Sequence, residues 1–251
     1  MNTLRYLRRI GIEALQPATL AGLARLQEQH VLTVPFENLD IRRAVPIELE
    51  TGALFDKVVV RRRGGFCYEL NGLFCELLRA LGYAVDLVSA RVFSDSGDAG
   101  PEFDHMALIV TMGTERYLVD VGFGDSARHP IRLPNGEVED ISGRYRVRPR
   151  EADSGCYVLE RRVDDGWKPQ FRFTDQPREI AEFAAMCTYH QTSPDSHFTQ
   201  RNMITIATPT GRFTLTDSKV IETESGVRME TPVSSHEEYE RTLAERFGIR
   251  F

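Results

Sequence analysis

The sequence predicts an α+β protein with a helical N-terminal part, an antiparallel β-barrel or strongly curved sheet, and a smaller part of mixed helix and strand. Apolar residues recur at helical spacing in the first 85 residues. From Asp86 onward, short β-rich runs alternate with turn dipeptides such as Asn135-Gly136. After Pro177 both patterns return. We therefore expect three domains, residues 1–85, 86–176 and 177–251, that pack as one body.

The strongest helical repeat lies in residues 70–81, and its apolar members are Leu70, Leu73, Phe74, Leu77, Leu78 and Leu81. Their spacing of i, i+3, i+4, i+7, i+8 and i+11 predicts a helix that faces a core along its whole length. Weaker repeats with the same spacing lie in residues 4–10 and 20–26. These segments predict the helical bundle of the N-terminal domain.

Short β-rich runs predict the remaining elements in order. The expected strands of the barrel are residues 86–93, 105–112, 116–123, 145–149, 156–163 and 168–173. The C-terminal part predicts a short helix at residues 178–187 and strands at residues 203–208, 212–223 and 227–233. Ser235 and Glu238 form a capping-box pattern in front of a last helix.

The composition excludes several classes of protein. The formal net charge of −6 argues against a protein whose main task is to bind nucleic acid, because neutralising phosphates needs a basic face. No segment reaches the roughly 18 apolar residues of a membrane span, and the N-terminus does not resemble a secretory signal. We therefore expect a cytoplasmic protein with no membrane or nucleic-acid partner, whose four cysteines are free thiols.

Cys67 is the candidate nucleophile. It lies three residues before Leu70, in the first turn of the strongest predicted helix, where free backbone N–H groups and the helix dipole favour an anion such as a thiolate. Gly64 and Gly65 allow a tight turn into this helix. The alternative is a small core residue, since free cysteine is commonly buried. Cys75, Cys156 and Cys187 lack these features and are interpreted as core residues.

A nucleophilic thiol needs a base, and the hairpin of residues 105–123 offers one. If Gly113 and Thr114 form a two-residue loop, residue 112 pairs with residue 115, and His105 and Asp120 become diagonal neighbours on one face. A slip of one residue would separate them. The other face is apolar throughout, which supports this register. The alternative is a core histidine beside a carboxylate that caps a turn.

The other histidines are weaker candidates for the base, and a metal site is not indicated. They are His30, His129, His190, His197 and His236, which we expect in loops or near helix ends. Cys67, His105 and Asp120 have no CxxC or HExxH spacing, so they are a weak signal for a metal. We expect no metal cofactor.

Four motifs give the chain a resemblance to a known family. "VPFENLD" at residues 34–40, "RGGFCYELN" at 63–71, "FDHMALIV" at 103–110 and "VDVGFG" at 119–124 resemble the arylamine N-acetyltransferases. The motifs occur in family order over the first half of the chain, and "SPDSHF" at 193–198 extends the likeness. The resemblance implies a papain-like core with a helical bundle, a β-barrel and a C-terminal α/β lid.

The resemblance also implies roles for particular residues. Cys67 would be the nucleophile, His105 the base and Asp120 the group that orients the base, in a ping-pong transfer from acetyl-CoA to arylamines, arylhydrazines or N-hydroxyarylamines. The residues expected to line the aryl pocket are Phe36, Phe123 and Phe198. Gly122 and Gly124 would approach the pyrophosphate of CoA. The implied partners are therefore acetyl-CoA and a small aromatic amine or hydrazine.

Two other classes of function remain open from the residues alone. A thiol hydrolase, or an amide synthase that uses another acyl donor, would have the same triad. A binding protein could keep the fold without chemistry, although all three triad positions are filled. The motifs and the glycine loop at residues 122–124 favour the acetyltransferase.

Overall fold

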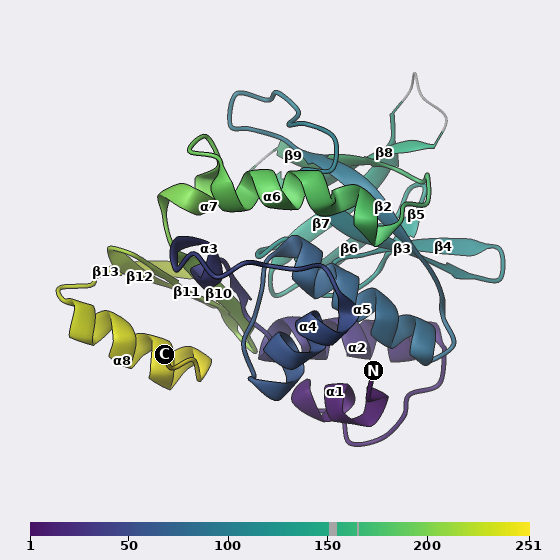
Figure 1. Ribbon diagram of the computed structural model, residues 1–251. Coiled ribbons are helices and arrows are strands. Elements are labelled where there is room, and N and C mark those ends of the chain that lie inside the picture. The colour runs from purple at the N-terminus through teal and green to yellow at the C-terminus, as the bar shows by residue number, and fades with distance from the viewer. Residues whose placement is uncertain (151–154, 165) are drawn as a thin grey trace.

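The computed structural model describes residues 1–150, 155–164 and 166–251. A group of helices, an eight-stranded barrel and a C-terminal sheet with its own helix lie side by side (Figure 1). This arrangement confirms the α+β fold class. Within the described residues, no helix is both long enough and apolar enough to cross a membrane.

The N-terminal helices pack around α5, the helix that the apolar repeat in residues 70–81 predicts. The elements are α1 (Thr3–Arg9), α2 (Leu20–Thr33), α3 (Leu39–Arg42), α4 (Thr51–Phe55), the π-helical turn η1 (Asp56–Val60) and α5 (Cys67–Ala80). The leucines of α5 are fully buried against α1, α2 and the first barrel strands. Asn2 and Thr19 cap α1 and α2 by accepting hydrogen bonds from backbone N–H groups of the first turns.

The barrel is an antiparallel sheet that curls until its edge strands approach each other. Its strands are β2 (Ala84–Val92), β3 (His105–Met112), β4 (Glu115–Val119), β5 (Ile131–Leu133), β6 (Glu137–Asp140), β7 (Gly143–Pro149), β8 (Cys156–Val163) and β9 (Gly166–Thr174). The order is β5-β4-β3-β2-β9-β8-β7-β6, so β9 returns to pair with β2. Phe171 and Phe173 of β9 lie in the apolar interior. The other face of β3 packs on α5.

The C-terminal part contributes a second sheet and four helical segments. Its elements are η2 (Ile180–Phe183), α6 (Ala184–Thr192), α7 (His197–Gln200), β10 (Met203–Thr208), β11 (Gly211–Thr216), β12 (Lys219–Glu224), β13 (Val227–Pro232) and α8 (His236–Phe247). The Ser235 hydroxyl accepts a hydrogen bond from Glu238 N, as the capping pattern predicts. The Glu238 carboxylate in turn accepts a hydrogen bond from the N–H group of Ser234.

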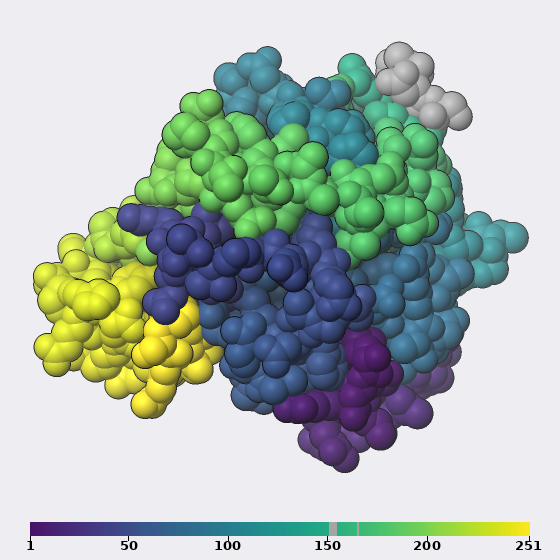
Figure 2. All heavy atoms as spheres, in the orientation of Figure 1, coloured from purple at the N-terminus to yellow at the C-terminus, as the bar shows by residue number. Residues whose placement is uncertain are grey.

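Three features of the C-terminal part differ from the sequence prediction. The strand expected at residues 212–223 is two antiparallel strands, β11 and β12. The helix expected at residues 178–187 begins as the 3-10 turn η2 and continues as α6 to Thr192. The sheet gains a fifth strand, β1 (Phe36–Glu37), which pairs with β10. In the space-filling view, the green segment that contains α6 and α7 lies between the barrel and the dark-blue segment that contains α3 (Figure 2).

Candidate active site

Cys67 is the first residue of α5 and is 3% exposed. The preceding residue, Phe66, has extended backbone angles, and its N–H group donates to Glu69 Oε2 at 3.1 Å. The side chain of Glu69 thereby closes the first turn of the helix. The sequence prediction that Cys67 starts the strongest helix is confirmed.

The burial of Cys67 affects its protonation state. Burial raises the pKa of the Cys67 thiol well above its usual range, and the backbone N–H of Met106 lowers it only in part. A thiolate at Cys67 therefore depends on the base that the hairpin offers as well as on the start of the helix. An anion at Cys67 needs a cation beside it, and the imidazolium form of His105 is the group that can supply one.

The hairpin of β3 and β4 has the register that its apolar face predicts. Met112 pairs with Glu115, and Leu108 pairs with Val119. His105 Nε2 lies 2.8 Å from Asp120 Oδ2, and both side chains are almost completely buried. Nδ1 is therefore the ring atom of His105 that can exchange a proton with a thiol.

Asn71 is a member of the site that the sequence analysis missed. Its Nδ2 atom donates to Asp120 Oδ1 at 2.9 Å and to Met106 O at 2.6 Å, while its Oδ1 atom accepts from Val121 N at 2.9 Å. Asn71 lies four residues after Cys67, so both side chains share a face of α5. That spacing within the motif "RGGFCYELN" was the signal that could have identified it.

Gly122 allows the strand of Asp120 to approach α5. A Cβ atom at this position would lie 2.8 Å from Cys67 Cα, closer than any side chain tolerates. The N–H group of Gly122 also donates to Asp120 Oδ1 at 2.8 Å. A glycine is therefore required here by space.

A buried network of five charged side chains holds the chain around the start of α5. Its members are Glu37, Asp40, Lys57, Arg63 and Glu69. Lys57 Nζ lies 2.8 Å from both Asp40 and Glu69, and Arg63 contacts Glu37 at 2.7 Å and Asp40 at 3.0 Å. Burial works to lower the pKa of Lys57, but the three carboxylates outweigh it and raise this pKa. Removing one member of such a network typically costs about 3–5 kcal/mol.

Cys67 and His105 line one cavity of about 280 Å³. The three phenylalanines named in the sequence analysis, Phe36, Phe123 and Phe198, line the same cavity, as does Gly122. The ring of Phe123 meets the ring of His105 edge to face at 5.1 Å. Gly124 lies in a small adjoining hollow and has a φ of +91°, a left-handed conformation that favours glycine.

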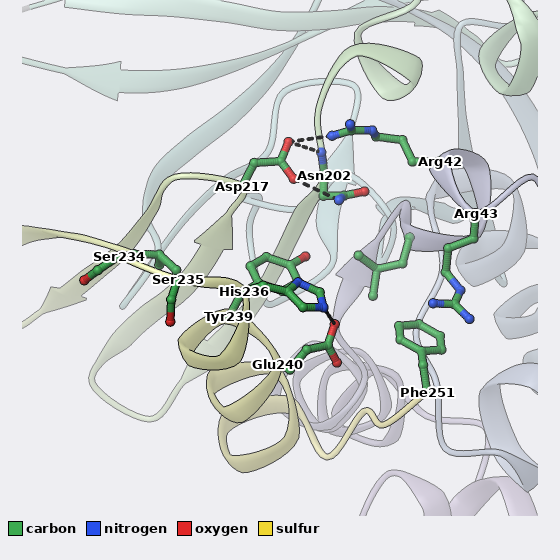
Figure 3. Close-up of a pocket in the computed structure, with 12 residues that line it drawn as sticks. Arg42, Arg43, Asn202, Asp217, Ser234, Ser235, His236, Tyr239, Glu240 and Phe251 are labelled. Carbon is green, nitrogen blue, oxygen red and sulfur yellow. Dashed lines mark hydrogen bonds and ion pairs between the residues drawn. The ribbon is translucent and has the colours of Figure 1, made fainter.

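A larger cavity, of about 540 Å³, lies between α3, the segment that follows β13, and α8. It has no thiol, and its charged side chains are engaged with one another. Arg42 pairs with Asp217 at 2.8 Å, and the guanidinium of Arg43 stacks 3.6 Å from the ring centroid of Phe251 (Figure 3). We do not assign the reaction to this cavity, because the hydroxyls of Ser234 and Ser235 in its lining are engaged with Glu238 at the start of α8, and Cys67 and His105 lie in the other cavity.

The remaining thiols are core residues, as the sequence analysis expects. Cys75, Cys156 and Cys187 are buried and unpaired. Burial raises the pKa values of Cys75 and Cys187 to about 12, so both are protonated at neutral pH. Among the described residues, no group of three or more histidine, cysteine, aspartate or glutamate side chains is arranged to hold a metal ion.

Comparison with known proteins gives consistent matches over the whole chain. A family model described as N-acetyltransferase matches residues 19–251. The curated arylamine N-acetyltransferase of Mycolicibacterium smegmatis is 34% identical over an alignment of 251 residues that covers 97% of this chain and 90% of that protein.

Solved structures extend the likeness to the fold. The NAT3 arylamine N-acetyltransferase of Bacillus cereus, described with a Cys-His-Glu catalytic triad, has a TM-score of 0.92 at 27% identity, with 100% of both chains covered. The Mycobacterium marinum arylamine N-acetyltransferase in complex with CoA has a TM-score of 0.90 at 32% identity, over 99% of this chain and 93% of that one.

Proposed function

Because the chain belongs to the arylamine N-acetyltransferase family, we propose that it is an enzyme that transfers acetyl from acetyl-CoA to aromatic amines, hydrazines or N-hydroxyarylamines. The observation that carries this proposal is the buried His105–Asp120 pair, joined at 2.8 Å, in the cavity that Cys67 also lines. The complex of the M. marinum relative with CoA supports acetyl-CoA as the donor.

In the first half-reaction, His105 Nδ1 takes the proton of the Cys67 thiol, and the thiolate attacks the carbonyl carbon of acetyl-CoA. The thiolate can form although burial raises the pKa of Cys67, because the imidazolium forms at the same time and its positive charge stabilises the thiolate. In the first turn of α5 the N–H groups of Glu69 and Leu70 donate to Phe66 O, and those of Cys67 and Tyr68 can stabilise the oxyanion. CoA leaves as its sulfur takes the proton from His105, and an acetyl thioester remains on Cys67.

In the second half-reaction, the amine attacks the thioester carbonyl and His105 removes a proton from its nitrogen. The C–S bond then breaks, and the Cys67 sulfur regains its proton from His105. Asp120 holds Nε2–H throughout, so Nδ1 remains the basic atom of the ring. The products are the N-acetylated amine and the resting enzyme.

The finer assignments of the site are part of the same proposal. Asp120 would fill the place of the glutamate in the triad of the B. cereus relative. Its position between Asn71, Gly122 N and His105 supports that role. Phe36, Phe123 and Phe198 would hold the aryl ring, since all three line the cavity of the thiol. Gly122 and Gly124 would approach the pyrophosphate of CoA.

Intact-mass measurement with acetyl-CoA and no amine tests the proposal. We expect the mass to rise by one acetyl group, mapped to the peptide of Cys67, and the acetyl group to leave quickly when an aromatic amine is added. Rapid loss to water with no preference for amines would indicate a thiol hydrolase instead. No uptake of acetyl would indicate a binding protein or an amide synthase with another acyl donor, and the proposal would fail.

A further inference from the structure

A second pair of carboxylate and imidazole lies in the cavity of Cys67. Asp104 and His190 both line this cavity, and His190 Nε2 lies 3.3 Å from Asp104 Oδ1. His190 comes from α6, and its Nδ1 atom lies 3.1 Å from the hydroxyl of Ser196. The mechanism above uses neither side chain of the pair.

The chain around Asp104 is built to hold this carboxylate in place. Phe103 has a φ of +64°, a left-handed conformation that is uncommon for a residue with a side chain. Its N–H group donates to Ser89 Oγ at 2.8 Å, and its carbonyl accepts from Tyr68 OH at 2.7 Å. At Gly100 a Cβ atom would lie 2.6 Å from Asp104 Oδ2. Two hydrogen bonds therefore fix the backbone just before Asp104, and the glycine at position 100 leaves room for its carboxylate.

The Asp104 carboxylate keeps spare capacity to accept hydrogen bonds. Its Oδ2 atom accepts one long hydrogen bond, from Val92 N at 3.3 Å. His190 Nε2 contacts Oδ1 at 3.3 Å without a hydrogen bond of good geometry, so it limits where the carboxylate can lie and leaves acceptor positions of Oδ1 free. A carboxylate has about four acceptor positions, and the side chain of Asp104 is 18% exposed, towards the cavity that it lines.

Asp104 also lies close to the thiol. After burial, nearby carboxylates add to the raised pKa of Cys67, and Asp104 is one of them. A negative charge here disfavours the thiolate that the first half-reaction needs. Its benefit must therefore come in a step where positive charge develops, and that step is the attack of the amine on the thioester.

We propose that Asp104, oriented by His190, accepts a hydrogen bond from the second N–H of the amine that attacks the acetylated Cys67. This inference rests on the proposed function. A primary amine has two N–H bonds and becomes positively charged as its C–N bond forms. His105 takes one proton and the other N–H, which stays in the amide product, points to Asp104. Asp104 is then a catalytic residue of the amine step, and His190 is a positioning residue.

The test compares nucleophiles that differ in their N–H bonds. The full chain is acetylated with acetyl-CoA, freed of CoA and mixed rapidly with 4-methylaniline, with its N-methyl derivative or with CoA. We expect Asp104→Asn to slow discharge to the primary amine about ten-fold or more, the loss typical of a hydrogen bond to a charged group. Discharge to the N-methyl derivative, whose single N–H must go to His105, should fall much less, as should discharge to CoA.

The ratio of the primary to the N-methyl rate is the decisive quantity. Asn has the shape of Asp, so the steric effect of the methyl group is common to both proteins. Asp98→Asn removes an exposed carboxylate from the same connection between β2 and β3, and it should leave the ratio at the wild-type value. His190→Gln should lower the ratio in the same direction as Asp104→Asn, which gives a second test if one variant folds poorly.

Equal slowing of all three nucleophiles in Asp104→Asn would overturn the inference, because it would mean that Asp104 only supports the fold or His105. An unchanged primary-amine rate would overturn it as well. Failure of the wild-type protein to take up acetyl would instead contradict the proposed function. Uptake of acetyl with an unchanged ratio would contradict only the role of Asp104.

Discussion

Asn71 joins the helix of Cys67 to the carboxylate of Asp120, with Nδ2 of Asn71 donating to Oδ1 of Asp120 at 2.9 Å. The same side chain bonds the backbone of β3 at Met106 and the residue after Asp120, Val121. One amide therefore connects the part of the chain that carries the thiol with the part that carries the imidazole and its partner.

We expect Asn71→Ala to lower both stability and acetyl transfer. The substitution leaves the buried carbonyl of Met106 and the N–H of Val121 without their partner, which costs about 1–3 kcal/mol of unfolding free energy for such a group. Asp120 loses a donor that fixes its orientation, so the rate of Cys67 acetylation should fall at least ten-fold. Urea unfolding and the rate of acetyl uptake measure the two effects. Asn135→Ala, at an exposed turn, is the matched control. Wild-type acetylation in a stable Asn71→Ala protein would contradict this role.

We expect Cys67→Ala to abolish acetyl transfer in a folded protein. Alanine suits the first turn of a helix, so α5 should form normally. Cys75→Ala is the matched variant on the same helix. It removes a buried thiol that is protonated at neutral pH, so it should lower the unfolding free energy and leave the rate nearly unchanged. Steady-state acetylation of an aromatic amine and urea unfolding separate the two cases. Turnover by purified Cys67→Ala, or a matching loss in Cys75→Ala, would mean that the wrong thiol has been assigned.

For Asp120→Asn we expect a folded protein that acetylates far more slowly. The amide keeps the shape but can donate its own N–H to His105 Nε2, which favours the tautomer with a proton on Nδ1 and no base for the thiol. Asp120→Glu should retain more activity than Asp120→Asn, since a relative with a glutamate in its triad is known. The measurement is the rate of acetyl uptake by intact mass. Equal rates in the wild type and in Asp120→Asn would make Asp120 a purely structural residue.

Local patterns predicted the His105–Asp120 pair because they constrain a hairpin completely. The loop at Gly113-Thr114 and the apolar face of the two strands allow one register, and that register fixes which side chains meet. The start of α5 at Cys67 was predictable for a similar reason, since the apolar repeat and the glycines before it are local signals.

Contacts between distant segments could not be predicted in this way. His190 meets Asp104 although the two lie 86 positions apart in the sequence, and no periodicity relates α6 to the start of β3. The strand β1 has two residues, too few for an alternating pattern. The raised pKa of Cys67 depends on burial by the whole fold, which the helix-start argument did not include. These features depend on tertiary packing and were found only in the structure.

The buried imidazole of His30 in α2 should make the stability of the protein depend on pH in the acid range. Burial, with a smaller effect of Arg9, lowers the pKa of His30 to about 3, and Tyr6 OH lies 2.9 Å from its Nε2 atom. The unfolded chain takes up this proton near pH 6.5 and the folded chain does not, so the unfolding free energy falls as the pH drops below 6.5. Between pH 7.5 and pH 5 the loss from this one group is about 2 kcal/mol. His30→Gln removes the group that titrates. Between pH 7.5 and pH 5 the unfolding free energy of this variant, measured with urea, should therefore fall by about 2 kcal/mol less than that of the wild type. Parallel pH profiles for the two proteins would show that His30 titrates in the folded state as it does in the unfolded chain.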